Sequence, residues 1–136
     1  MTDINIGAIT EALNDKIDRD MRNVDTVAGG DAVIAFQRPT AENNYTWFRK
    51  YASGWVEQGG QASVTGYSTT SNSTITLPVE MGSSHFFAQA TILGNGENIG
   101  MAQEVAILST TQISLRINYS SSVTRTMSWE VKGFAA

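Results

Sequence analysis

The first part of the chain carries apolar residues at helical spacing. Steps of 3, 4, 4, 4 and 3 residues separate them, and the positions between are mostly charged or amide residues. This pattern predicts an amphipathic helix with one narrow apolar stripe, within a helical segment at residues 1–28. The stripe consists of Ile6, Ile9, Leu13, Ile17, Met21 and Val24.

A lone helix of this length is only marginally stable in water, so its stripe must pack against something. The stripe can pack against either of two partners: the rest of the chain, or copies of the same helix. A narrow stripe suits a helical bundle better than a sheet face, which favours self-association. The steps depart from strict heptad spacing and favour a straight or slightly right-handed bundle. We expect this segment to set the oligomeric state.

From Asp31 onward, short runs of β-branched and aromatic residues alternate with Gly, Asn and Ser clusters. Apolar and polar residues alternate with period two over residues 86–92, 113–119 and 127–131, as in strands with one buried face. No helical pattern returns. About eight or nine strands in residues 29–136 predict an all-β domain, an antiparallel β-sandwich or barrel, and we favour the sandwich.

Local signals predict where some strands end. The expected strands include residues 32–37, 45–51, 55–58, 88–93 and 102–108. Arg38-Pro39 should stop the first of them, and Gly54 should take a positive φ in a hairpin between the second and third. Gly59-Gly60 indicates a break in the chain. Asn95-Gly96 predicts a hairpin turn between the last two.

Five aromatic residues crowd into residues 45–55, with Arg49 and Lys50 among them. They are Tyr45, Trp47, Phe48, Tyr51 and Trp55. Aromatic faces beside charged groups can bind sugar rings or anchor a protein interface. Large aromatics more often supply core area in small β domains, and we therefore expect most of them to fill the core.

Composition narrows the classes of function. A chain of 136 residues fits one core, and it contains no cysteine, so disulfides and thiolate metal sites are excluded. We expect no signal peptide, no membrane insertion and a soluble protein. Residues 1–31 hold seven acidic and three basic residues, whereas the rest hold six of each. Neither part offers the basic face that nucleic acid requires.

Few residues of the chain are candidates for catalysis or for metal binding. His85 is the single histidine, so one chain cannot build a multi-histidine metal site, although three copies on a three-fold axis could. A structural role for His85 is favoured. Six glutamates in the β region mark no catalytic pair, and Gly94-Asn95-Gly96 is explained by a turn rather than a phosphate loop. We expect no enzyme activity, no cofactor and no metal.

Three segments together resemble the distal domains of bacteriophage and prophage tail fibres. Residues 12–20 read ALNDKIDRD, followed by Asn23-Val24, and are similar to the repeat that precedes such domains. Residues 44–60 read NYTWFRKYASGWVEQGG and resemble their W-Y-R-x-Y-x-S-G-W-x-E-Q-G-G signature. Residues 128–136 read SWEVKGFAA and are similar to their aromatic-Gly-aromatic terminus.

The resemblance implies a homotrimeric fibre tip whose C-terminal β-sandwich contacts the host surface, often through a glycan, or through an outer-surface protein. It implies that the signature Trp, Tyr and Gly residues are structural and that loops contact the receptor. The candidate receptor-binding residues are Asn43, Asn44, Asn95, Glu97, Asn98, Tyr119, Ser120 and Ser121. No His-x-His repeat is present, so the metal sites of some fibre tips do not carry over.

The function expected from the sequence is therefore adsorption to a host cell by a virion tail fibre. Fibres are usually long, whereas this chain starts at Met1 without a virion-attachment region. It is either an excised tip or a separate small protein. Two alternatives remain: a structural cap for trimerisation and folding, or a small polysaccharide depolymerase, against which the absence of β-helix repeats argues.

Overall fold

The computed structural model describes residues 10, 13–14, 31–66, 72–94, 101–119 and 121–136. The chain divides into two units, Met1–Ala32 and Val33–Ala136. Of the stripe residues, only Leu13 lies among the described residues, where it is exposed. The remaining five lie outside them, and the helix of residues 1–28 and its bundle stay predictions.

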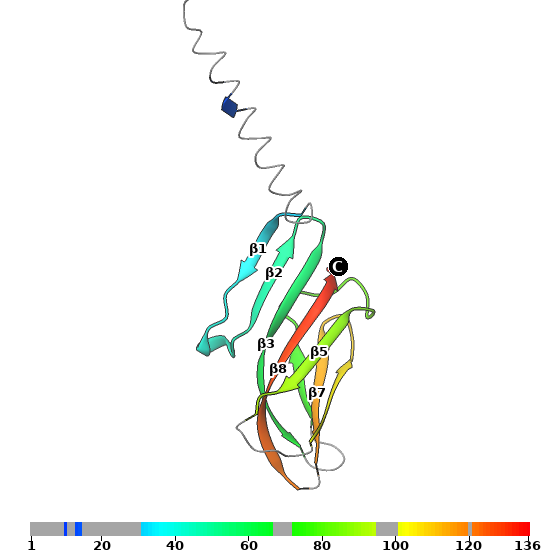
Figure 1. Cartoon of the computed structure of the whole chain (residues 1–136). Coiled ribbons are helices and arrows are strands. Elements are labelled where there is room, and N and C mark those ends of the chain that lie inside the picture. The colour runs from blue at the N-terminus through cyan, green and yellow to red at the C-terminus, as the bar shows by residue number, and fades with distance from the viewer. Residues whose placement is uncertain (1–9, 11–12, 15–30, 67–71, 95–100, 120) are drawn as a thin grey trace, which may run out of the picture. The chain divides into compact units, whose positions relative to one another are not determined.

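The second unit is all-β, as the sequence predicts (Figure 1). Two antiparallel sheets form, with strand orders β1-β2-β3-β8-β5 and β4-β7-β6. A short 3-10 turn, η1 (Ala41–Asn43), joins the first two strands. The strands are β1 (Val33–Gln37), β2 (Trp47–Tyr51), β3 (Trp55–Gly66), β4 (Asn72–Thr76), β5 (Phe87–Ile92), β6 (Ala102–Ile107), β7 (Gln112–Asn118) and β8 (Val123–Phe134).

The core lies between the two sheets and follows the period-two pattern. β8 contributes Met127, Trp129 and Val131, which are at most 3% exposed. β7 contributes Ile113, Leu115 and Ile117, which are at most 1% exposed. Because alternate residues of a strand point to the same face, each of these strands supplies one continuous apolar row to the core. The alternation seen in the sequence is confirmed for β8 and β5. In β7, Ser114 on the opposite face is buried as well, at 5% exposed.

The hairpin predicted around Gly54 is confirmed, since β2 pairs with β3 and Gly54 has a φ of 93°. The break predicted at Gly59-Gly60 is wrong, because β3 continues through both residues and pairs with β8 along its whole length. A Cβ atom on Gly59 would lie 2.7 Å from both the Trp129 carbonyl oxygen and the Trp47 indole nitrogen. The absence of a side chain at these glycines therefore lets tryptophan side chains pack directly against the backbone of β3, and the strand does not bend there.

The hairpin predicted at Asn95-Gly96 is also wrong. β5 pairs with β8 in the five-stranded sheet, whereas β6 pairs with β7 in the three-stranded sheet. The connection between β5 and β6 therefore passes from one sheet to the other. Residues 95–100, which form most of it, lie outside the described residues.

The five aromatics of residues 45–55 do not fill the core, contrary to the sequence-based expectation. None of them belongs to the buried cluster, and Tyr45 is 47% exposed. β1 and β2 lie at one edge of the five-stranded sheet, next to β3 and away from the buried rows of β7 and β8. Trp47, Phe48 and Tyr51 of β2 and Trp55 of β3 are consequently half-buried on the five-stranded sheet.

Candidate receptor-binding surface

The pairing register defines two ends of the β unit. At one end, Val33 lies opposite Tyr51 and Trp55 lies opposite Phe134. At the other end, Gly66 pairs with Val123, and Asn118, the last residue of β7, pairs with Ala102, the first residue of β6. We call this second end the distal end, because the chain enters the unit at β1, which begins at the first end (Figure 1).

Two of the candidate receptor-binding residues lie at the distal end. Tyr119 follows the last residue of β7 and is half-buried, and Ser121 is exposed in the connection to β8. The described residues that flank residues 67–71 also lie at this end. Asn95, Glu97, Asn98 and Ser120 lie outside the described residues, so their role stays a prediction.

The structure does not bring Asn43 and Asn44 together with the distal candidates. The Asn43 side-chain oxygen accepts hydrogen bonds from the backbone N–H groups of Thr40 and Thr46, each at 2.9 Å. Its amide nitrogen donates to the Arg38 carbonyl at 3.2 Å. Asn44 takes a left-handed conformation with a φ of 56°, which asparagine tolerates better than most residues. Asn43 therefore holds the β1–β2 connection in place.

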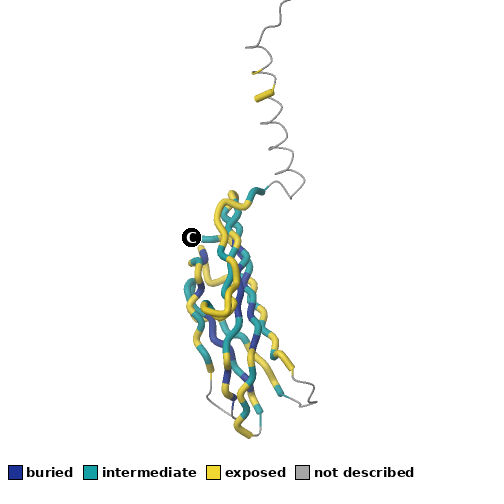
Figure 2. Tube along the Cα trace, turned by 90° about the vertical axis from the view of Figure 1, so that its left-hand side faces the viewer, coloured by how far each residue is buried: buried dark blue, intermediate teal, exposed yellow. Residues whose placement is uncertain are grey.

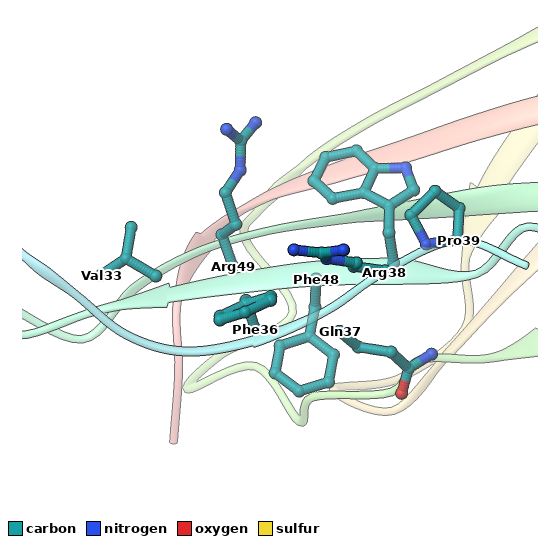
Figure 3. Close-up of a pocket in the computed structure, with 8 residues that line it drawn as sticks. Val33, Phe36, Gln37, Arg38, Pro39, Phe48 and Arg49 are labelled. Carbon is teal, nitrogen blue, oxygen red and sulfur yellow. The ribbon is translucent and has the colours of Figure 1, made fainter.

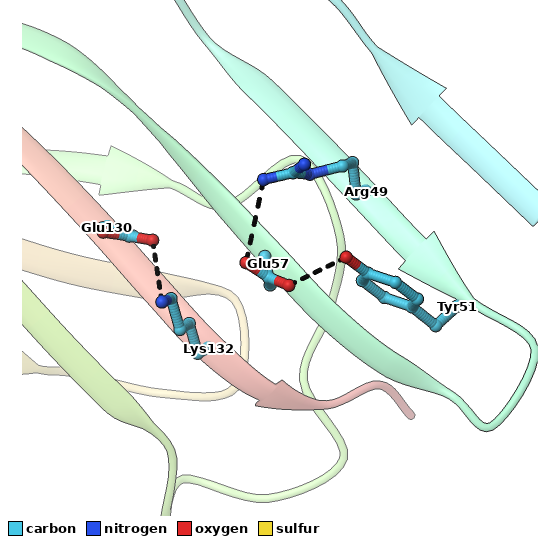
Figure 4. Close-up of polar contacts among 5 residues, drawn as sticks. All are labelled: Arg49, Tyr51, Glu57, Glu130 and Lys132. Atoms are coloured by element: carbon cyan, nitrogen blue, oxygen red, sulfur yellow. Dashed lines mark hydrogen bonds and ion pairs between the residues drawn. The ribbon is translucent and has the colours of Figure 1, made fainter. Parts of the chain in front are cut away.

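The outer face of the five-stranded sheet carries a cross-strand row that the sequence did not reveal. From one edge to the other it reads Phe36, Arg49, Glu57, Lys132 and Phe87. Glu57 lies 3.8 Å from the Arg49 guanidinium and accepts a 2.9 Å hydrogen bond from the Tyr51 hydroxyl (Figure 4). Lys132 lies 3.3 Å from Glu130 (Figure 4). Charges in the middle of the face are thus compensated within the chain.

Two hollows border this row. The first, of about 440 Å³, lies at β1 and β2 and is lined mainly by apolar and arginine side chains (Figure 3). There, Phe48 and Arg49 point to opposite sides of the sheet (Figure 3). Its lining residues are Val33, Phe36, Gln37, Arg38, Pro39, Trp47, Phe48 and Arg49.

The second hollow, of about 300 Å³, lies beside Trp55 and Phe134, whose rings meet edge to face at 5.2 Å. His85, Phe87 and Lys132 also line it. His85 is exposed, and no three His, Asp or Glu side chains of the described residues gather as a metal site would need. No helix among the described residues has the length and apolar character to cross a membrane.

No protein-family model and no curated protein matches this sequence. Solved structures share its fold. An N-truncated R2-type pyocin tail fibre matches with a TM-score of 0.55 and 17% identity, over 75% of this chain and 39% of that chain. A C-terminal fragment of the R2 pyocin fibre of P. aeruginosa matches with a TM-score of 0.56 and 17% identity, over 75% of this chain and 26% of that one. The chain thus spans well under half of either structure, and the fold it shares is that of part of the R2 pyocin tail fibre.

Proposed function

We propose that this chain is the receptor-binding tip of a phage-type tail fibre. The observation that carries the proposal is the shared fold with R2 pyocin tail fibres at TM-scores of 0.55 and 0.56. Three segments of the sequence, residues 12–24, 44–60 and 128–136, resemble tail-fibre distal domains in the same order along the chain and support the proposal independently of the fold.

The receptor is a host cell-surface glycan or outer-surface protein, bound without catalysis. Contact is made by the distal end, through Tyr119, Ser121 and the neighbouring loops. One geometric fact supports this choice: the chain enters the β unit at the opposite end. Loops held on a rigid sheet scaffold are common binding sites, because they vary without disturbing the core.

The chain acts as a homotrimer assembled through residues 1–28. Several copies on one particle raise the avidity of individually weak contacts, which suits adsorption to a cell surface. In this account, the helix sets the number of copies and the distal loops set the receptor.

Binding of the fluorescently labelled full chain to a panel of bacterial strains tests the proposal. Receptor binding predicts saturable binding to some strains, with competition by unlabelled chain. A chain that assembles normally and binds no strain would instead be a structural cap. Release of reducing ends from capsule or lipopolysaccharide would identify a depolymerase and would contradict binding without catalysis.

A further inference from the structure

Two exposed apolar surfaces lie at opposite edges of the five-stranded sheet. The β1 surface comprises Val33, Ile34 and Phe36, which are 45%, 62% and 62% exposed. The β5 surface comprises Phe87 and Phe134, which are 72% and 60% exposed and line one hollow with Trp55. Large apolar side chains that are exposed close together favour interaction with another molecule.

The two surfaces lie at the same level of the sheet. Phe36 and Phe87 are the two ends of the cross-strand row described above, with three strands between them. Between them, Arg49 and Lys132 are each compensated by a glutamate of the same chain. The row therefore presents no uncompensated charge that would repel an identical row on another molecule.

The short link from the predicted helix to β1 favours a second copy as the occupant. Val33 lies five residues after the end of the predicted helix, a separation that an extended chain spans in at most about 18 Å. If parallel helices hold the copies together, their β1 strands are confined near the common axis. β1 is also an edge strand, exposed along most of its length (Figure 2), and an apolar edge strand is a site at which another chain packs.

We propose that the β1 surface of one copy packs against the β5 surface of the next. Because two different surfaces meet, the contact is heterologous and closes into a ring when the rotation between copies permits. From the proposed function, the inference takes only that the chain forms a homo-oligomer. It does not depend on receptor binding.

Crosslinking tests the contact directly, because the chain has no cysteine of its own. The full chain with Phe36→Cys and Phe87→Cys together, treated with a short bismaleimide, should give dimers and larger species on a denaturing gel. Each single variant should remain monomeric there, whereas the two single variants co-expressed should give a crosslinked dimer. A matched control places cysteines on two exposed edge-strand positions of the other sheet, Thr74→Cys and Glu104→Cys, and should not crosslink.

A second measurement uses charge in place of cysteine. Phe36→Asp and Phe87→Asp should each raise the concentration for half-assembly at least about tenfold in light scattering. A monomeric wild-type chain would overturn the inference, as would crosslinking of a single variant to itself or equal crosslinking of test and control pairs. Cell binding distinguishes the proposed interface from the proposed function. If the chain crosslinks as expected but binds no cells, only receptor binding is refuted. If the chain binds cells but does not crosslink, only the interface is refuted.

Discussion

The side chain of Gln58 satisfies both backbone hydrogen-bonding groups of Val79. Its amide nitrogen donates to the Val79 carbonyl at 2.9 Å, and its amide oxygen accepts from the Val79 N–H at 2.9 Å. Gln58 is 0% exposed and also lies 3.2 Å from the Met81 sulfur. The amide thereby fixes the segment before β5 to the centre of the five-stranded sheet, and it gives the glutamine of the signature block a structural role.

Replacement of Gln58 by alanine should therefore destabilise the fold. Gln58→Ala removes both hydrogen bonds to Val79, which is half-buried, and each hydrogen bond contributes about 0.5–1.5 kcal/mol, to which the lost packing of the buried Gln58 side chain adds. We expect the free energy of unfolding in urea to fall by about 2 kcal/mol or more. Gln89→Ala, at an exposed position of β5, is the control and should change it by less than about 0.5 kcal/mol. Equal effects would contradict this role of Gln58.

A side chain at Gly59 should destabilise the fold as much as the loss of the Gln58 amide. Gly59→Ala forces a Cβ atom against the Trp129 carbonyl oxygen, 2.7 Å away, so the strand must shift. Overpacking of this kind typically costs about 1–3 kcal/mol, measurable as a lower thermal midpoint. Gly94→Ala meets nothing within 4 Å and should be neutral or slightly stabilising. A tolerated Gly59→Ala would show that the two tryptophans do not require bare backbone.

The two partners of Glu57 should contribute unequally. Tyr51→Phe removes a 2.9 Å hydrogen bond and should cost about 1 kcal/mol at any salt concentration. Arg49→Met removes a 3.8 Å ion pair whose arginine is 52% exposed, so its effect should be smaller and should fade in high salt. Denaturant unfolding at low and high ionic strength measures both. The reverse order of effects would mean that the ion pair, not the hydroxyl, positions Glu57.

Removal of residues 1–28 should weaken assembly. The apolar stripe of this segment is the predicted oligomerisation element, so the truncated chain should show a lower mass in light scattering at micromolar concentration. Its circular dichroism should keep the β signal. An unchanged mass would assign assembly to the β unit alone.

The sequence predicted the strands whose alternate residues are buried. Ile113, Leu115 and Ile117 alternate with polar residues because these three side chains share the face of β7 that meets the core, although Ser114 on the other face is buried as well. Which strands pair was harder to predict, because pairing depends on distant partners. Asn95-Gly96 is a strong local turn signal, yet β5 and β6 bond to different sheets.

The candidate site was predictable only in part. The resemblance to tail fibres selected loop residues as the site. The predicted strand of residues 113–119 included Tyr119, whereas β7 ends at Asn118, so Tyr119 lies with Ser121 in the connection to β8. The same reasoning selected Asn43, but its amide is engaged in the β1–β2 connection, and composition cannot distinguish a structural asparagine from a binding one. The aromatic residues of positions 45–55 were expected to fill the core, whereas the sheet order places β1 and β2 at an edge of the five-stranded sheet.

Binding of the purified 136-residue chain to the bacterial strain that responds best in the panel tests the central claim most directly. We predict saturable binding by the wild-type chain and by Thr74→Ala, which alters an exposed residue of β4. The double variant Tyr119→Ala with Ser121→Ala should bind at least tenfold more weakly, which corresponds to about 1.4 kcal/mol, with its stability unchanged. Equal binding by all three proteins, or no saturable binding to any strain, would contradict a receptor-binding tip whose distal end makes the contact.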